Sequence, residues 1–360
     1  MEKKDKNLNV PNLRFPEFSG EWEKCMIGDV LKVGNGKDYK HLAEGDIPVF
    51  GTGGYMLSVN DFLYDGDSVF IGRKGTINKP FFYSGKFWTV DTLFYTHSFN
   101  KVIPHFVYGL FQRVNWNNYN EASGVPSLSK STIEKIPIAI PSIEEQQKIS
   151  SLLSLLDQRI ETQKKIIEDL KKLKDAISVR LFTSATCGKR ELSDLATIVM
   201  GQSPSSQCYN TNNEGLPLIQ GNLDITKGKL TPRIYSSEVT KKCQAGDVIL
   251  TVRAPVGEVA IADFGACIGR GVCAIKPFDD TLSVLIYQFL QYFKPKWFSL
   301  EQGSTFTSVS RDDIMSIKVA IPSIQAIETL NILDKKITIE DVILNNLNFQ
   351  KKILVNQMFI

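Results

Sequence analysis

Basic side chains stand beside glycines at several turns of this 360-residue chain. Arg73 and Lys74 occupy a turn bounded by glycines, and Arg270 has a glycine on either side. Glycines allow a backbone to approach a phosphate, and a guanidinium can donate two hydrogen bonds to O6 and N7 of guanine. These turns therefore favour contact with a nucleic acid. The alternative is a solvated hairpin tip.

Amide and hydroxyl side chains form a second group of candidate contacts. Gln202 and Ser203 open the loop GQSPSS, and Gln220 and Asn222 belong to the segment IQGN. An amide side chain can pair with adenine through two hydrogen bonds, although both segments could instead be turns without a ligand. The remaining candidates for contact with DNA are Lys37, Tyr39, Lys40, Thr52, Tyr55, Thr89, Arg253, Thr305 and Thr307.

Catalytic patterns are missing from the sequence. A P-loop would need G-x-x-x-x-G-K-[ST], and the segment around Lys37 lacks the first glycine and has Asp38 at the last position. The three histidines and six cysteines show no spacing typical of a metal site or a catalytic triad. We therefore expect no catalytic residue, no metal and no cofactor bound by this chain.

The composition is that of an ordinary globular protein, with 42% hydrophobic and 22% charged residues. A net charge of +3 means that a nucleic-acid partner would be held by local patches. Scattered cysteines suit a reducing compartment, and the charged N-terminus MEKKDKNLNV is unlike a signal peptide. No stretch has the length of a transmembrane helix, so we expect a cytoplasmic protein.

Two segments with heptad periodicity must position the candidate loops. In both, apolar residues alternate at spacings of four and three, which is typical of a coiled-coil seam. Polar residues interrupt both seams at the same register positions, namely Gln163 and Lys174 in the first and Glu340 and Lys351 in the second. Shared interruptions indicate a tandem duplication in which each copy ends in a long helix. The apolar seam positions are Leu153, Leu156, Ile160, Ile167, Leu170, Ile177, Leu330, Leu333, Ile337, Leu344, Leu347 and Leu354.

The segments before the helices repeat as well. SKSTIEKIPIAIPSI ends the first copy and SRDDIMSIKVAIPSI ends the second, whereas residues 37–45 and 203–215 differ strongly between the copies. This pattern is expected if one scaffold carries two different binding surfaces. We predict an α+β fold with an N-terminal flexible arm (1–20), a globular α/β domain (21–142), a long helix (143–187), a second α/β domain (188–323) and a second helix (324–360).

The duplication also predicts an arrangement. If a pseudo-two-fold axis relates the copies, the helices pack as an antiparallel coiled coil with one domain at each end. Half-sites one turn apart on B-DNA are about 34–36 Å centre to centre. Two unlike domains held apart by such helices would read two unlike half-sites with an unread spacer between them.

The chain resembles the specificity subunit of type I restriction–modification systems. The resemblance rests on the segment PNLRFPEFSGEW before the first domain and on the paired segments IPIAIPSIEEQQKI and VAIPSIQAIETL. It also rests on the paired motif D-x-x-I that starts each seam, at Asp157 and Asp334. In the second copy, GQSPSS is followed by Tyr209-Asn210 and by GLPLIQGN. Their order and double occurrence cover nearly the whole chain.

The resemblance implies two target-recognition domains alternating with two helices. It also implies a non-catalytic phage-defence subunit that reads a bipartite, asymmetric site in double-stranded DNA. Such a subunit recruits two methyltransferase (M) subunits, which use S-adenosylmethionine, and restriction (R) subunits, which use ATP and Mg²⁺. The alternative is a two-headed scaffold that binds protein or glycan.

Overall fold

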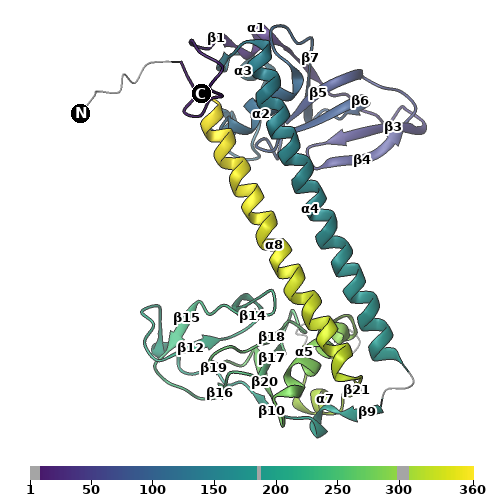
Figure 1. Ribbon diagram of the computed structural model, residues 1–360, viewed down its shortest axis with the longest axis vertical. Helices are drawn as coiled ribbons and strands as arrows, with labels where there is room; N and C mark the ends of the chain where they lie inside the picture. Colours follow the sequence, from purple (N-terminus) through teal and green to yellow (C-terminus); the bar gives the residue numbers. More distant parts are fainter. Residues whose placement is uncertain (1–8, 185–187, 298–307) are drawn as a thin grey trace. The chain divides into compact units, whose positions relative to one another are not determined.

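The computed structural model describes residues 9–184, 188–297 and 308–360. Contacts divide the chain into two compact units (Figure 1): unit 1 is Met1–Lys164 with Val342–Ile360, and unit 2 is Lys165–Asp341. Each unit contains a globular head and parts of the two long helices. We call residues 23–140 head 1 and residues 188–321 head 2.

Head 1 is built on a six-stranded sheet with the order β2-β7-β5-β6-β3-β4. Strands β3 and β6 pair in parallel, and the other pairs of this sheet are antiparallel. The apolar run in β5 is buried and forms the strand that its composition predicts. The elements are β1 (Glu23–Met26), α1 (Ile27–Val30), β2 (Lys32–Asn35), β3 (Glu44–Gly51), β4 (Gly54–Val59), β5 (Tyr64–Gly72), β6 (Phe81–Thr89), β7 (Leu93–His97), α2 (Pro104–Arg113), the 3-10 helix η1 (Trp116–Tyr119), α3 (Lys130–Glu134) and β8 (Pro137–Ile140).

Head 2 contains a four-stranded sheet, β10-β20-β17-β18, and a five-stranded sheet, β11-β15-β12-β19-β16. The four-stranded sheet is antiparallel and has the same connection pattern as β2-β7-β5-β6 of head 1. Its elements are β9 (Gly188–Glu191), η2 (Leu192–Asp194), β10 (Ala196–Met200), η3 (Ser206–Cys208), β11 (Tyr209–Asn210), β12 (Leu216–Ile219), η4 (Asn222–Asp224), β13 (Ile225–Thr226), β14 (Lys229–Leu230), β15 (Ile234–Ser236), β16 (Lys242–Cys243), β17 (Val248–Thr251), β18 (Val259–Ile261), β19 (Ala266–Ile268), β20 (Val272–Pro277), α5 (Thr281–Phe293), η5 (Lys294–Lys296), α7 (Arg311–Met315) and β21 (Lys318–Ile321).

The two long helices are α4 (Ile143–Thr183, 41 residues) and α8 (Ile324–Met358, 35 residues). In unit 1, Leu153 of α4 shares a core with Val355 near the end of α8. In unit 2, Ile177 near the end of α4 packs on a core that contains Leu330 near the start of α8. Five of the twelve predicted seam positions are buried, and the other seven are half-buried. The buried five are Leu153, Ile160, Ile167, Leu330 and Leu347.

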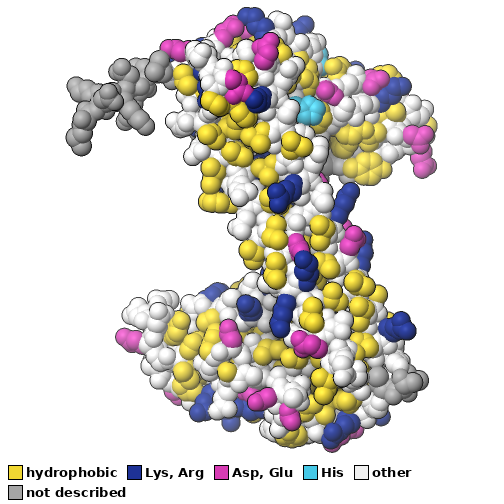
Figure 2. All heavy atoms as spheres, viewed as in Figure 1, with side chains coloured by type: hydrophobic (Ala, Val, Ile, Leu, Met, Phe, Trp, Pro, Cys, Tyr) yellow, Lys and Arg dark blue, Asp and Glu magenta, His cyan; other side chains and the backbone are white. Residues whose placement is uncertain are grey.

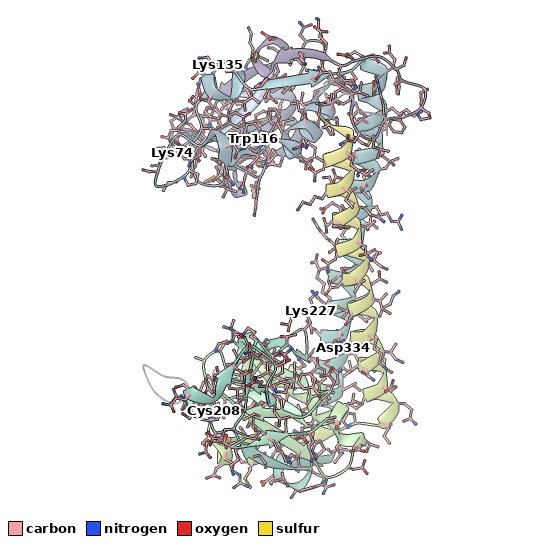
Figure 3. All side chains as sticks on the ribbon, turned by 90° about the vertical axis from the view of Figure 1, so that its left-hand side faces the viewer. Lys74, Trp116, Lys135, Cys208, Lys227 and Asp334 are labelled. Carbon is pink, nitrogen blue, oxygen red and sulfur yellow. The ribbon has the colours of Figure 1, made fainter. Side chains whose placement is uncertain are left out.

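Ion pairs occupy two of the polar seam positions. In unit 1, Nζ of Lys351 lies 2.5 Å from Oδ1 of Asp157. In unit 2, Nζ of Lys174 lies 2.6 Å from Oδ1 of Asp334, which Figure 3 labels. The two pairs join corresponding residues of the repeat. A helix shift by one turn would separate both pairs and leave partly buried charges without partners, so these pairs favour one register.

A head tyrosine lies beside each of these ion pairs. Burial, followed by the charge of Asp157, raises the pKa of Tyr108 on α2 to about 12. Burial, followed by the charge of Asp334, raises the pKa of Tyr287 on α5 to about 12. Each head therefore contacts the long helices through the same kind of three-residue cluster. Sequence reasoning missed both tyrosines because they lie outside the seam.

The expectation of a flexible arm is wrong from Asn9 onwards. The amide of Trp22 donates to the carbonyl of Asn9, and the amide of Leu13 donates to that of Gln357. The guanidinium of Arg14 pairs with the buried carboxylate of Glu145 at 2.7 Å. Prolines prevent a helix here, but they allow an extended segment that packs on α4 and α8 within unit 1.

Among the described residues, none of the helices combines the length and hydropathy that crossing a membrane requires.

Replacing Leu153 by alanine is expected to lower the free energy of unfolding by about 2–5 kcal/mol. Its side chain is 5% exposed, and its Cδ1 would lie 3.1 Å from a Cβ added at Gly109 of α2. The matched control is Leu155→Ala on the same helix, because Leu155 is 63% exposed and its loss should change stability by no more than about 0.5 kcal/mol. Urea unfolding of the full chain measures both, and equal losses would contradict the packing described above.

Candidate nucleic-acid interface

The same network of backbone hydrogen bonds holds the base of the candidate loops in both heads. In head 1, the amide of Gly36 donates to the carbonyl of Leu93, and that of Lys37 donates to Thr89. In head 2, the amide of Gly201 donates to the carbonyl of Val272, and the amide of Gln202 donates to the carbonyl of Ile268. The two heads therefore hold the loops after β2 and β10 in the same way, although the loop sequences differ.

Close packing explains the glycine at the root of each loop. A Cβ added to Gly36 would lie 1.9 Å from the carbonyl oxygen of Val90. A Cβ added to Gly201 would lie 2.2 Å from the carbonyl oxygen of Gly269. Any side chain at either position would push the loop away from the neighbouring turn.

Five of the predicted contact residues of head 2 line one pocket of about 680 Å³. They come from four separate segments of the chain, and the loop that carries Cys208 and Tyr209 forms part of the wall. Cys208 is labelled in Figure 3, on the side of head 2 away from the long helices of its unit. The five residues are Ser203, Gln220, Asn222, Arg253 and Arg270.

Hydrogen bonds fix the orientation of Gln220 in this pocket. Its Nε2 donates to the hydroxyl of Tyr209 at 3.0 Å, and that hydroxyl donates to the carbonyl of Pro204 at 3.2 Å. The backbone amide of Gln220 donates to the buried carboxylate of Asp224 at 2.8 Å, and Asp224 also pairs with Arg233. The Oε1 of Gln220 is thereby turned away from Tyr209. Sequence reasoning noticed Tyr209 as a motif residue but missed its role in orienting Gln220.

The two arginines of the pocket have exposed side chains. Ser203 supports the turn that carries Arg270, because its Oγ accepts from the amide of Arg270 at 3.2 Å. A β-bridge to Ser308 holds the backbone of Arg253. Gln202 does not line the pocket, and its carbonyl accepts from the hydroxyl of Thr240.

In head 1, three predicted residues line a pocket of about 650 Å³. They are Tyr39 and Lys40, from the loop after β2, and Tyr55 on β4. Tyr55 is 63% exposed, and its hydroxyl lies 3.2 Å from Oγ of Ser58. Thr52 lies at the tip of the β3–β4 hairpin, and the carbonyl of Lys37 accepts from the indole of Trp88 at 2.9 Å. Arg73, Lys74, Thr52 and Lys37 do not line this pocket.

Arg73 and Lys74 follow β5 and have exposed side chains. The Arg73 guanidinium donates to the carbonyl of Asp91 at 3.3 Å and lies 5.9 Å from the centroid of the Phe94 ring. These contacts hold Arg73 against the head. Lys74 is labelled in Figure 3, where it lies far from the long helices of its unit.

The structure contradicts the prediction for Thr89. Its side chain is fully buried, and its Oγ1 has no hydrogen-bond partner, so a ligand at the surface cannot reach it. Position 89 supports the loop through its backbone carbonyl instead. Thr305 and Thr307 lie outside the described residues. No group of three or more metal-binding side chains occurs in the described part of the chain.

A family model of the type I restriction modification DNA specificity domain matches residues 19–172 and 186–348. The chain is 29% identical over 326 residues to the putative type I restriction enzyme MjaX specificity subunit of Methanocaldococcus jannaschii, covering 82% of this chain and 74% of that protein. It is 22% identical to the MjaVIII specificity subunit of the same organism, covering 89% of this chain and 87% of that protein.

Solved structures share the fold. The S subunit of a type I restriction–modification system from M. genitalium superposes with a TM-score of 0.69 at 17% identity, covering 98% of this chain and 99% of that one. A second solved structure, which concerns complex assembly and conformational transition of the type I restriction–modification system, superposes with a TM-score of 0.60 at 20% identity. The match covers 94% of this chain and 97% of that one. The alternative of a protein- or glycan-binding scaffold finds no support in these likenesses. This chain belongs to the family of type I restriction–modification specificity subunits.

Proposed function

We propose that each head reads one half of a bipartite, asymmetric DNA site for a type I restriction–modification complex. The observation that carries this proposal is the head 2 pocket, which five polar or basic side chains from four segments line together. The fold that holds this pocket is shared with specificity subunits. Such a cluster offers donors and acceptors for base edges in the major groove and donors for backbone phosphates.

The two heads would read different bases through different side chains. In head 2, Gln220 has the chemistry to pair with adenine, and Asn222, Gln202 and Arg270 would add further contacts to bases or phosphates. In head 1, the corresponding loops offer Lys37, Tyr39, Lys40, Thr52 and Tyr55. Contact with backbone phosphates would position each head, and base contacts would supply the sequence.

The long helices would set the distance between the half-sites. The two ion pairs between corresponding residues support an antiparallel coiled coil with pseudo-two-fold symmetry. We propose the division 1–20, 21–142, 143–187, 188–323 and 324–360, with the first and second globular segments as target-recognition domains. The length of the helices would then determine the unread spacer.

Exposed apolar residues on α8 support an interface with M subunits. Figure 2 shows hydrophobic side chains exposed among charged ones along the helical part of the molecule. We propose that two M subunits cover such residues and supply S-adenosylmethionine-dependent methylation, while R subunits supply ATP- and Mg²⁺-dependent cleavage. The chain itself would be a non-catalytic cytoplasmic subunit. The exposed large apolar residues of α8 are Ile324, Ile332, Ile339, Val342, Phe349 and Ile353.

Replacing Gln220 by alanine is expected to change the bases recognised in one half-site only, because the amide that would pair with adenine is removed. The measurement is methylation mapping of a genome exposed to the chain with its M subunits. The control is Gln244→Ala, an exposed glutamine of head 2 outside the pocket. A motif that is identical in wild type and the Gln220 variant would remove Gln220 from base reading.

Exchanging residues 21–142 for the first domain of another specificity subunit is expected to replace one half-site and keep the other. The same methylation map measures the outcome. If both half-sites changed together, the heads would not read DNA independently.

Inserting four residues into α4 adds about one helical turn, or about 6 Å, and should lengthen the tolerated spacer between the half-sites. Replacing four exposed residues of α4 without changing its length is the control. An unchanged spacer in the lengthened chain would contradict the role of the helices in spacing.

A further inference from the structure

The hydrogen-bond network makes Lys74 of head 1 and Arg253 of head 2 equivalent. The amide of Arg73 donates to the carbonyl of Thr92 at 2.8 Å, and that of Val252 donates to the carbonyl of Gly271 at 2.9 Å. The carbonyls of Arg73 and Val252 then accept from Leu128 at 2.9 Å and from Val309 at 3.0 Å. The next residue along the chain is Lys74 in one head and Arg253 in the other.

A β-bridge completes this equivalence. Lys74 bridges Ser127, and Arg253 bridges Ser308, in both cases in an antiparallel sense. Two residues later, Ser129 and Ser310 cap the helices α3 and α7 with their hydroxyls. The backbone at Lys74 and Arg253 is therefore held on both sides in both heads, so the side chains project from equivalent, fixed positions.

Positive charge is retained at this position while it changes at its neighbours. At the loop root, Lys37 of head 1 corresponds to Gln202 of head 2. On the adjoining turn, Asp91 corresponds to Arg270, which reverses the charge. Residues that read bases must differ between heads with different half-sites. A contact with the phosphate backbone carries no sequence information and can be the same in both.

The side chains of Lys74 and Arg253 are also available to a ligand. Both are exposed, and no ion pair to either occurs in the parts of the chain that the structure describes. The neighbouring Arg73 differs, because its guanidinium is held by the carbonyl of Asp91 and the ring of Phe94.

We propose that Lys74 and Arg253 each bind a backbone phosphate of the DNA at equivalent places in the two half-sites, and that this shared contact docks both heads in the same orientation. The inference rests on the proposed function and deepens it, because it separates docking contacts from base-reading contacts. Lys74 and Arg253 would make docking contacts, and Gln220 would make a base-reading contact.

The test uses the complex of this chain with its M subunits and a duplex that contains the methylated motif found for the wild type. Binding constants are measured across a range of KCl concentrations for Lys74→Ala, Arg253→Ala and the double variant. Each single change should weaken binding and reduce the salt slope by about 1, and the double variant should reduce it by about 2. The methylated motif should stay the same in all three.

Three controls separate charge from folding. Lys74→Arg and Arg253→Lys keep the charge and should restore most of the slope. Lys135→Ala removes an exposed lysine at the end of α3, labelled in Figure 3 apart from Lys74, and should leave the slope unchanged. Thermal melting of each complex reports whether the variant is folded, so a folded variant with an unchanged slope would overturn the proposal.

A changed base in the motif of either alanine variant would also overturn it, because the residue would then read sequence. These results are distinguishable from failure of the proposed function itself. If the wild-type complex methylated no bipartite motif, the DNA-reading role would fail before any variant was compared.

Discussion

Packing of the heads against α4 and α8 is the constraint on which the rest of the structure depends. The core of head 1 includes Ile149 and Leu153 of α4 and Val355 and Met358 of α8. The core of head 2 includes Phe182 of α4 and Leu330 of α8 among its members. Each such buried side chain contributes about 1.5–3 kcal/mol, so neither head completes its core without segments from both long helices.

Polar clusters fix the register of the two long helices, which apolar packing alone does not determine. An apolar seam alone tolerates shifts of a helix by whole turns, because one leucine resembles the next. Lys351 with Asp157 and Lys174 with Asp334 do not tolerate such a shift, because each ammonium would lose its carboxylate in a partly buried site. The tyrosines beside these pairs extend the same restriction to the head helices.

A network of backbone hydrogen bonds supports the variable loops of both heads. Gly36 and Gly201 permit the closest approach of each loop to the neighbouring turn, and backbone hydrogen bonds make no demand on side-chain type. Side chains beyond the network can therefore change without loss of the fold. Tyr209 and Asp224 show how a head then orients the particular side chain that it carries, here Gln220.

The sequence by itself determined the features that depend on periodicity and repetition. The duplication and the two seams were predicted from spacing along the chain, and the family was predicted from the resemblance of its motifs, in their order and double occurrence. Tertiary structure decided which distant residues meet. Ser203, Gln220, Arg253 and Arg270 converge on one pocket through loops that have no period, and the burial of Thr89 follows from sheet packing. The equivalence of Lys74 and Arg253 was hidden as well, because backbone hydrogen bonds that leave no trace in side-chain type define it.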